Sequence, residues 1–353
     1  MFSLSDYDYE LDERLIAQKP VDKRNHSRLL VLHNQTGKIF HSRFEKLCDF
    51  FSPADVLAIN NTKVVPGRLF GEKKTGGKVE ILLLDYARVC KNNPNNGELI
   101  FKCLVKASKG SKPGSLFFFD NKLKAEVISR QDEIYTLKFL FEESFDSILN
   151  QIGNMPLPPY IKRDAEEICG YDKKSYQTVY ATQKGAIAAP TAGLHFTRAL
   201  LEKLKNKGVK IVEITLHVGY GTFLPVRVSD IRKHKMHSEQ YFISKESAQI
   251  INHAKANCNR VVAVGTTSVR TLEYAADKNG YVSSGSGDCD LFIYPGYKYK
   301  VIDAMITNFH LPGSTLLMLV SAFAGHAKLF EAYKEAINNN YRFYSYGDAM
   351  LIA

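Results

Sequence analysis

Short runs in which apolar and polar residues alternate fill the chain between residues 64 and 141. Turn-forming Gly, Pro, Asn and Asp residues separate them, as at Pro113-Gly114 and Asp120-Asn121. The six runs are VVPGRLFG, KVEILLLDY, ELIFKCLVKA, SLFFF, KLKAEVIS and EIYTLKFLF. A period of two predicts half-buried strands, and short strands at regular spacing predict a sandwich or a small antiparallel barrel. We expect no helix inside this block.

Strand and helix patterns alternate on either side of the block. DVLAIN precedes it as a buried strand, and SFDSILNQIG follows it as a helix. Further along, residues 260–264 and 300–306 each form a strand pattern that is followed by a polar loop and a helix. Such alternation predicts an α/β fold. We therefore expect a discontinuous α/β domain of residues 1–62 and 151–353, with an all-β domain inserted at residues 63–150.

The central stretch QKGAIAAPTAGLHFTRALLEKLKNKGVKIVEITLHVGYGTFLP predicts a loop, a helix, a strand and a second loop. Thr197 is placed to cap the helix and Gly208 to end it. The two loops carry His195 and His217. Because ligands bind beyond the carboxyl ends of parallel strands, we expect His217 to meet the loops GTTS (residues 265–268) and TNFHLPG (residues 307–313) at one rim.

Four smaller elements are also predicted. Residues 11–18 form a short amphipathic helix pattern, and residues 28–33 and 38–43 form a hairpin pattern around the turn NQTG. SSGSGD (residues 283–288) predicts a surface loop. MPLPPYIKR (residues 155–163) predicts an extended segment, either a rigid linker, which its spacing favours, or an arm that contacts nucleic acid.

The composition allows an RNA partner without requiring one. Lys and Arg number 47 against 37 Asp and Glu, a formal charge of +10, which suits a polyanion but equally a merely basic enzyme. The six cysteines form no CxxC pair, the N-terminus has no export signal, and the apolar stretch of residues 316–323 is too short to span a bilayer. We therefore expect a cytoplasmic protein that is not embedded in a membrane. The histidine spacing gives no metal-ligand pattern, so we expect no metal site.

Seven long segments carry a resemblance to one family. They are GAIAAPTAGLHFT, TLHVGYGTFLPV, MHSEQY, VVAVGTTSVRTLE, LFIYPGY, DAMITNFHLPGSTLLMLVSAFAG and YRFYSYGDAMLI. Together they resemble the S-adenosylmethionine:tRNA ribosyltransferase-isomerases of queuosine biosynthesis, in order and along essentially the whole chain. The resemblance implies a barrel-like α/β main domain with an inserted antiparallel β-barrel.

The resemblance also implies a reaction. The ribosyl moiety of S-adenosylmethionine is transferred, with isomerisation, to 7-aminomethyl-7-deazaguanine in a tRNA anticodon, giving epoxyqueuosine-tRNA, adenine and methionine. S-adenosylmethionine is then a co-substrate, no further cofactor is implied, and tRNA carrying the 7-deazaguanine precursor is the partner. We expect a monomer, because nothing in the sequence suggests an obligate interface.

Proton transfer in this chemistry needs groups that titrate near neutral pH, which favours histidines. For any single histidine a structural role is the commoner case, and convergence at one rim reverses that preference. Our candidates for catalysis are His217 and His195, with His310 and Glu239 as weaker ones. For S-adenosylmethionine they are Thr191, Gly193, Gly219, Gly221, Thr222, Thr266, Thr267, Ser268 and Asn308. For tRNA they are Lys63, Arg68, Lys162 and Arg163.

Two other functions remain as alternatives. An S-adenosylmethionine-dependent tRNA methyltransferase would need an early glycine-rich Rossmann loop with an acidic partner, and the chain has none. A non-catalytic RNA-binding protein built on the inserted barrel would leave the histidine-bearing loops unexplained.

Overall fold

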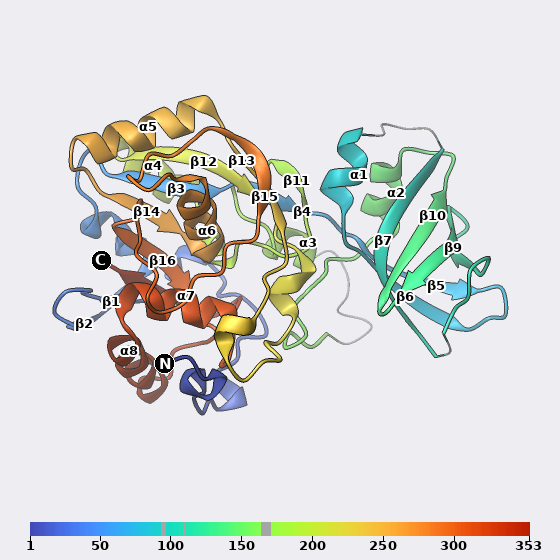
Figure 1. Cartoon of the computed structure of the whole chain (residues 1–353), viewed down its shortest axis with the longest axis horizontal. Helices are drawn as coiled ribbons and strands as arrows, with labels where there is room; N and C mark the ends of the chain where they lie inside the picture. Colours follow the sequence, from blue (N-terminus) through green and yellow to red (C-terminus); the bar gives the residue numbers. More distant parts are fainter. Residues whose placement is uncertain (93–96, 109, 164–170) are drawn as a thin grey trace.

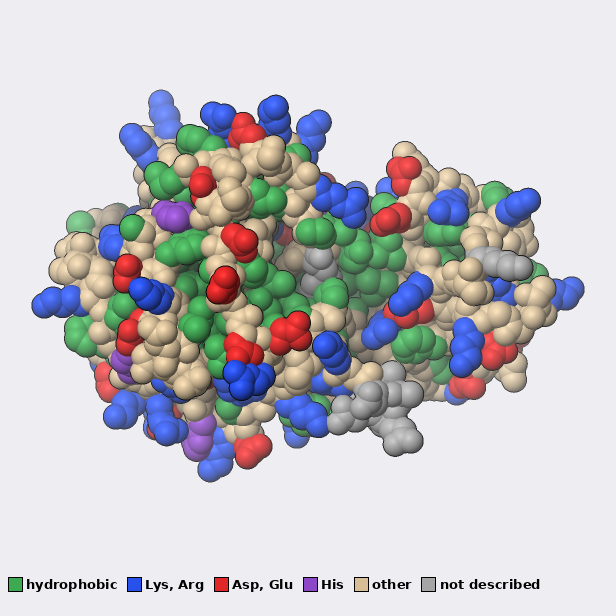
Figure 2. Space-filling view, turned by 90° about the horizontal axis from the view of Figure 1, so that it is seen from below, with side chains coloured by type: hydrophobic (Ala, Val, Ile, Leu, Met, Phe, Trp, Pro, Cys, Tyr) green, Lys and Arg blue, Asp and Glu red, His purple; other side chains and the backbone are tan. Residues whose placement is uncertain are grey.

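The computed structural model describes residues 1–92, 97–108, 110–163 and 171–353. It consists of two parts that lie side by side, an α/β part that contains both termini and a smaller β-barrel (Figure 1). In the space-filling view of Figure 2 the two parts form separate lobes, with hydrophobic side chains gathered where the lobes meet. The prediction of an α/β fold with an inserted antiparallel β-barrel is confirmed.

The α/β part is built on a nine-stranded mixed sheet. In spatial order its strands are β15 (Gly285–Cys289), β13 (Glu239–Ile243), β12 (Lys210–Leu216), β3 (Val56–Asn60), β14 (Val261–Val264), β16 (Ala304–Asn308), β17 (Ala349–Ile352), β1 (Arg28–Leu32) and β2 (Ile39–Arg43). The four strands β12, β3, β14 and β16 run parallel to one another. Their carboxyl ends therefore lie at the same edge of the sheet, as the loop patterns predicted.

Helices cover both faces of this sheet, which explains why β3 is apolar from Val56 to Ile59. Val56 and Ala58 of β3 face a core that also contains residues of the helices α5–α8, whereas Leu57 and Ile59 face a second core with α4. The helices are α4 (Arg198–Asn206), α5 (Lys245–Ala256), α6 (Gly265–Ala275), α7 (Thr315–Ala324) and α8 (His326–Asn338).

The inserted part is a closed barrel of six antiparallel strands around its own aromatic core. The strands, in order around the barrel, are β10 (Ile134–Leu140), β7 (Glu98–Ala107), β6 (Lys78–Leu83), β5 (Arg68–Lys73), β8 (Leu116–Phe119) and β9 (Leu123–Gln131). They lie inside the predicted insert of residues 63–150, whose boundaries stay a prediction. The helices beside the barrel are α1 (Tyr86–Asn92) and α2 (Phe145–Ile152).

A two-stranded parallel ribbon lies between the two parts (Figure 1). It pairs β4 (Thr62–Val64) with β11 (Gln183–Ala186), and the short helix α3 (Tyr171–Ser175) precedes β11 in the chain. The ribbon brings the start of the insert next to the GAIAAPTAG segment, about 120 residues later in sequence.

Several local predictions are confirmed. β1 and β2 form the predicted hairpin, and the Thr197 side chain caps α4 by accepting from Leu200 N–H at 3.2 Å. Gly208 has a φ of +94°, as expected for a left-handed helix end.

Other local predictions are wrong. α1 interrupts the block in which no helix was expected, and the predicted helix at residues 11–18 shrinks to a 3₁₀ turn, η2 (Glu13–Leu15). GTTS is the first turn of α6, and most of SSGSGD belongs to the edge strand β15, whose backbone pairs with β13. The other 3₁₀ helices among the described residues are η1 (Leu4–Tyr7), η3 (Arg24–His26), η4 (Phe44–Phe50), η6 (Thr191–His195), η7 (Tyr220–Phe223) and η8 (Ile231–Lys233).

In the part of the chain that the structure describes, no single helix is long and apolar enough to cross a membrane. α7 and α8 meet such a test by length and composition only as a pair bent by 112°. The cysteines at positions 48, 90, 103, 258 and 289 are free thiols, and Cys169 lies outside the described residues.

Candidate active site

Polar side chains from separate loops meet in a pocket of about 620 Å³ at the carboxyl ends of β14 and β16. The GAIAAPTAG segment and the TFLP segment close the pocket with small and apolar residues. Six of the predicted site residues line it, namely Thr191, Thr222, Thr266, Thr267, Asn308 and His310. The parallel strands explain why the segments after β12, β14 and β16 converge, because these strands end at the same edge of the sheet, whereas Thr191 comes from η6 after the ribbon strand β11.

The first turn of α6 forms one wall of this pocket. The chain passes from β14 into the helix at Gly265, whose φ of +82° is in the left-handed region that favours glycine. No side chain caps α6, so its first N–H groups are left for another acceptor. The Thr267 hydroxyl is buried and has no hydrogen-bond partner among the described residues. This wall therefore offers donors to an anionic group such as a carboxylate.

A hydrogen-bonded chain fixes the Asn308 side chain at the end of β16. Its Oδ1 accepts from Thr191 Oγ1 at 3.1 Å, and its Nδ2 lies 3.2 Å from Nε2 of His195. On the other side of the ring, Nδ1 of His195 lies 2.7 Å from the Ser27 hydroxyl. His195 therefore stands behind Asn308, outside the pocket, and orients the amide.

Burial keeps two of the predicted histidines neutral. Burial, with smaller contributions from Arg342 and Arg24, lowers the pKa of His195 to about 3. Burial also lowers the pKa of His310 to about 3. His310 lines the pocket, its Nε2 lies 2.7 Å from the Thr307 hydroxyl, and its backbone N–H donates to the Tyr333 hydroxyl.

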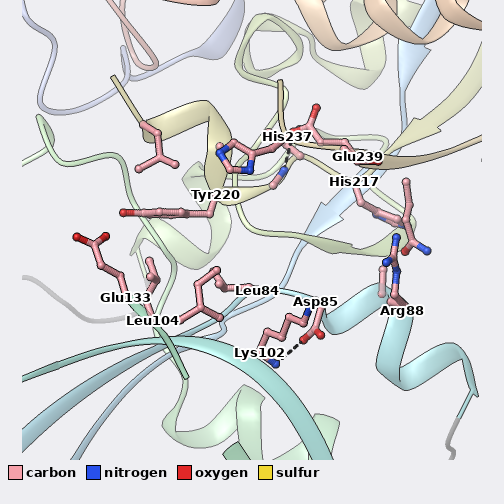
Figure 3. A pocket seen from close by; sticks show the side chains of 18 of the residues that line it. Leu84, Asp85, Arg88, Lys102, Leu104, Glu133, His217, Tyr220, His237 and Glu239 are labelled. Atoms are coloured by element: carbon pink, nitrogen blue, oxygen red, sulfur yellow. Dashed lines mark hydrogen bonds between the residues drawn. The ribbon is translucent and has the colours of Figure 1, made fainter. Parts of the chain in front are cut away.

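A second hollow of about 860 Å³ lies between the barrel and the α/β part. Figure 3 shows His217, Tyr220, His237 and Glu239 on one side of it, and Leu84, Asp85, Lys102, Leu104 and Glu133 of the barrel on the other. We call this hollow the interdomain cleft. Val218 and Leu224 line both the cleft and the 620 Å³ pocket, so the two adjoin. His217 and His310 thus occupy neighbouring cavities, whereas the sequence predicted a common rim.

His217 is held at the edge of the cleft by the β4–β11 ribbon. Its Nδ1 lies 2.8 Å from the Thr62 hydroxyl, and its backbone N–H donates to Gln240 O at 2.9 Å. A Cβ atom at Gly185, which has a φ of +155°, would lie 2.7 Å from two atoms of the imidazole. Gly185, the first glycine of GAIAAPTAG, therefore leaves space for the His217 ring.

A buried ion pair forms part of the wall between the two cavities. Arg270 of α6 pairs with Glu239 of β13, and both side chains are about 5% exposed or less. The other carboxylate oxygen accepts from Gly219 N–H at 2.7 Å, and Arg270 Nε donates to Leu291 O at 3.0 Å. Glu239 lines the cleft and Arg270 the pocket. Because both carboxylate oxygens have partners, the geometry favours a positioning role for Glu239.

Comparison with known proteins shows which family the chain belongs to. The family model described as queuosine biosynthesis protein matches residues 4–352. The chain belongs to this family. Proteins named S-adenosylmethionine:tRNA ribosyltransferase-isomerase from Acetivibrio thermocellus and Geotalea uraniireducens are 51% and 50% identical to it, each over 99% of both chains.

A solved structure resembles this chain as well. The crystal structure of S-adenosylmethionine tRNA ribosyltransferase from Thermotoga maritima is 38% identical in sequence, with a TM-score of 0.54. The match covers 99% of this chain and 100% of the Thermotoga chain.

Four predicted ligand contacts lie outside the 620 Å³ pocket. Gly219 and Gly221 line the interdomain cleft instead. The Ser268 hydroxyl is fully buried and donates to Val264 O within the helix. Gly193 packs against Tyr180, whose hydroxyl would lie 2.1 Å from an added Cβ. Ser268 and Gly193 therefore contribute to the packing of the protein interior. The sequence motifs around them are explained by this burial.

The predicted tRNA contacts are spread over different surroundings. The guanidinium of Arg163 is 7% exposed and donates to both oxygens of Asp172, which disfavours a contact with tRNA. Arg68 pairs with Glu80 at 2.7 Å and is about a third exposed. Lys162 is exposed, and Lys63 lines a further cavity beside the ribbon.

Arg270 is the residue of the site that sequence reasoning missed. A cation among the apolar residues of VVAVGTTSVRTLE was the available signal, since buried charges require a partner. For metals, no group of three or more His, Cys, Asp or Glu that could hold an ion occurs within the described ranges.

Proposed function

We infer that this chain is an S-adenosylmethionine:tRNA ribosyltransferase-isomerase. It transfers and isomerises the ribosyl moiety of S-adenosylmethionine onto 7-aminomethyl-7-deazaguanine in the tRNA anticodon, giving epoxyqueuosine-tRNA with release of adenine and methionine. The observation that carries this conclusion is an identity of about 50% along 99% of both chains to relatives with that name. We further propose that it acts in the cytoplasm as a monomer, with S-adenosylmethionine as co-substrate and no other cofactor.

The 620 Å³ pocket is our proposed site for S-adenosylmethionine. Its volume is in the range of small-molecule sites, and its lining combines apolar residues with a few convergent polar groups. The carboxylate of the methionine moiety suits the uncapped first turn of α6 and the unpartnered Thr267 hydroxyl. Asn308, fixed by Thr191 and His195, suits a polar group of the ribose.

The sulfonium acidifies the neighbouring ribose methylene, so a base can begin the sequence by removing that proton. Adenine then needs a proton or a hydrogen-bond donor as it leaves, and the amine of the tRNA base must be neutral to attack. His310 lines the pocket as a neutral imidazole, and a nearby sulfonium charge favours that neutral form. A pKa of about 3 makes His310 a weak base, so we assign to it a hydrogen bond to a reacting group in the pocket.

His217 lies on the cleft side of the wall, next to the backbone of Gly219. The deazaguanine has to approach the ribosyl carbon from the tRNA side, and the cleft adjoins the pocket through Val218 and Leu224. We therefore propose that His217 accepts the proton that the attacking amine loses. His195 and the Glu239–Arg270 pair act as positioning groups, the former on Asn308 and the latter on the Gly219 loop.

One assay tests the function. The protein is incubated with S-adenosylmethionine and tRNA that carries the 7-aminomethyl-7-deazaguanine base, with the same tRNA lacking this base as control. Release of adenine and methionine only with the modified tRNA is the expected result. Formation of S-adenosylhomocysteine would establish a methyltransferase instead, and binding without turnover would establish an RNA-binding protein.

A further inference from the structure

A third cavity, of about 480 Å³, lies beside the β4–β11 ribbon. We call it the basic cavity, because five of its lining residues are cationic: Arg24, Lys63, Lys173, Lys174 and Arg198. No carboxylate lines it in the described ranges. Successive side chains of a strand point to opposite faces, so Thr62 of β4 contacts His217 while Lys63 points into the basic cavity.

Three of these cations are available to a ligand. Lys63, Lys174 and Arg198 form no side-chain hydrogen bond or ion pair with any residue that the structure describes. Lys63 contributes to lowering the pKa of Asp146, but the carboxylate oxygens of Asp146 bond to Lys184 and Tyr86. Like charges gathered around one hollow, with no carboxylate among its described lining residues, favour an anionic occupant.

The other cations build the cavity wall. Arg24 donates to Gln177 O at 2.6 Å and to Lys174 O at 2.7 Å, which ties the backbone that carries Lys174. The Gln177 amide in turn bonds both backbone groups of Val64, at 3.1 and 2.7 Å. Lys173 donates to Asn150 O at 2.8 Å. The cavity is therefore held in shape before a ligand arrives.

A buried hydroxyl in this wall has no partner in the described part of the chain. Thr178 is 5% exposed, and its Oγ1 makes no hydrogen bond with the described residues, although buried hydroxyls are normally paired. Together with three unpaired cations it provides the donors that a phosphate group accepts.

We propose that the basic cavity binds a phosphodiester group of the tRNA backbone, through Lys63, Lys174, Arg198 and the Thr178 hydroxyl. This inference rests on the proposed function, since it supplies the tRNA. The cavity lies across the thickness of the ribbon from His217, so a phosphate bound there anchors the tRNA while the modified base occupies the cleft. Phosphate contacts of this kind set the register of a nucleic acid and carry no sequence information.

The test compares Lys174→Ala/Arg198→Ala with the wild type. We expect KM for tRNA to rise about tenfold or more, because charge-assisted hydrogen bonds to phosphate are lost, while KM for S-adenosylmethionine and kcat stay unchanged. The slope of log KM against log salt should fall by about 1. Lys334→Ala is the matched control, because Lys334 is an exposed lysine on α8, away from the ribbon (Figure 1).

Thr178→Val gives a second, independent readout. Removing an unpartnered buried hydroxyl should leave the melting temperature unchanged or raise it, yet KM for tRNA should rise several-fold. A structural role for Thr178 would give the opposite pair of results, a lower melting temperature with normal KM.

A third measurement compares the affinity of the wild type and the double variant for the substrate tRNA in the absence of S-adenosylmethionine. Absent turnover in the wild type would count against the proposed function, whereas this binding measurement would still test the basic cavity. The proposal is overturned if the double variant binds tRNA as tightly as the wild type, or if Lys334→Ala weakens binding as much.

Discussion

The neutral state of His195 can be tested by replacing it with glutamine. A glutamine amide keeps one donor and one acceptor for Ser27 and Asn308 but cannot titrate. In the wild type, burial lowers the pKa of His195 to about 3. The unfolded chain has the ordinary histidine pKa of about 6.5 and so binds the extra proton first as the pH falls.

The sign and the size of the effect follow from this difference. Stability due to the neutral ring is complete above about pH 6.5 and is lost as the pH falls toward about 3. At about pH 5 the histidine of the unfolded chain has gained its proton and that of the folded chain has not. The free energy of unfolding of the wild type is therefore roughly 2 kcal/mol lower than at neutral pH. His195→Gln should therefore lose roughly 2 kcal/mol less than the wild type over this interval, whatever the substitution costs at neutral pH.

Urea unfolding at about pH 7.5 and about pH 5 measures this quantity. The chain has no tryptophan, so far-ultraviolet circular dichroism is the suitable signal. His310 has a similarly lowered pKa and remains in both proteins, so it cancels in the comparison. If the two proteins lose equal stability on acidification, His195 titrates freely in the folded state and the reasoning is refuted.

Three further outcomes follow from the site. Arg270→Met should destabilise the protein by about 3–5 kcal/mol in urea unfolding, because Glu239 is left buried without its partner; unchanged stability would mean that water reaches the carboxylate. Thr267→Val should raise KM for S-adenosylmethionine several-fold without lowering the melting temperature, and normal KM would exclude a contact with the ligand. His217→Ala should reduce kcat about 100-fold or more while equilibrium binding of S-adenosylmethionine persists; near-normal turnover on saturating tRNA would remove its catalytic assignment.

Local pattern explains which elements the sequence predicted well. Alternating side chains predicted the barrel strands, and the apolar run DVLAIN predicted β3, because burial on one or both faces leaves a periodic trace. Thr197 and Gly208 marked the ends of α4 through capping chemistry that involves only near neighbours. α1 and β15 were missed because packing against other segments determines their conformation, and their own residues favour it only weakly.

The sequence likewise predicted some features of the candidate site and missed others. The sequence placed Thr266, Asn308 and His310 at one edge, since parallel strands bring their carboxyl ends together. It did not reveal that His195 stands behind Asn308, nor that His217 lies in a neighbouring cavity.

What the sequence alone determined is the pair of folds, the family and the loops that carry the chemistry. The tertiary structure decided which side chains are partners: Glu239 with Arg270, and Arg163 with Asp172. It also decided which polar groups have no partner within the described ranges, as in the basic cavity. The physical reason is that periodicity and capping depend on neighbours along the chain, whereas pairing and burial of charge depend on segments that meet only after folding.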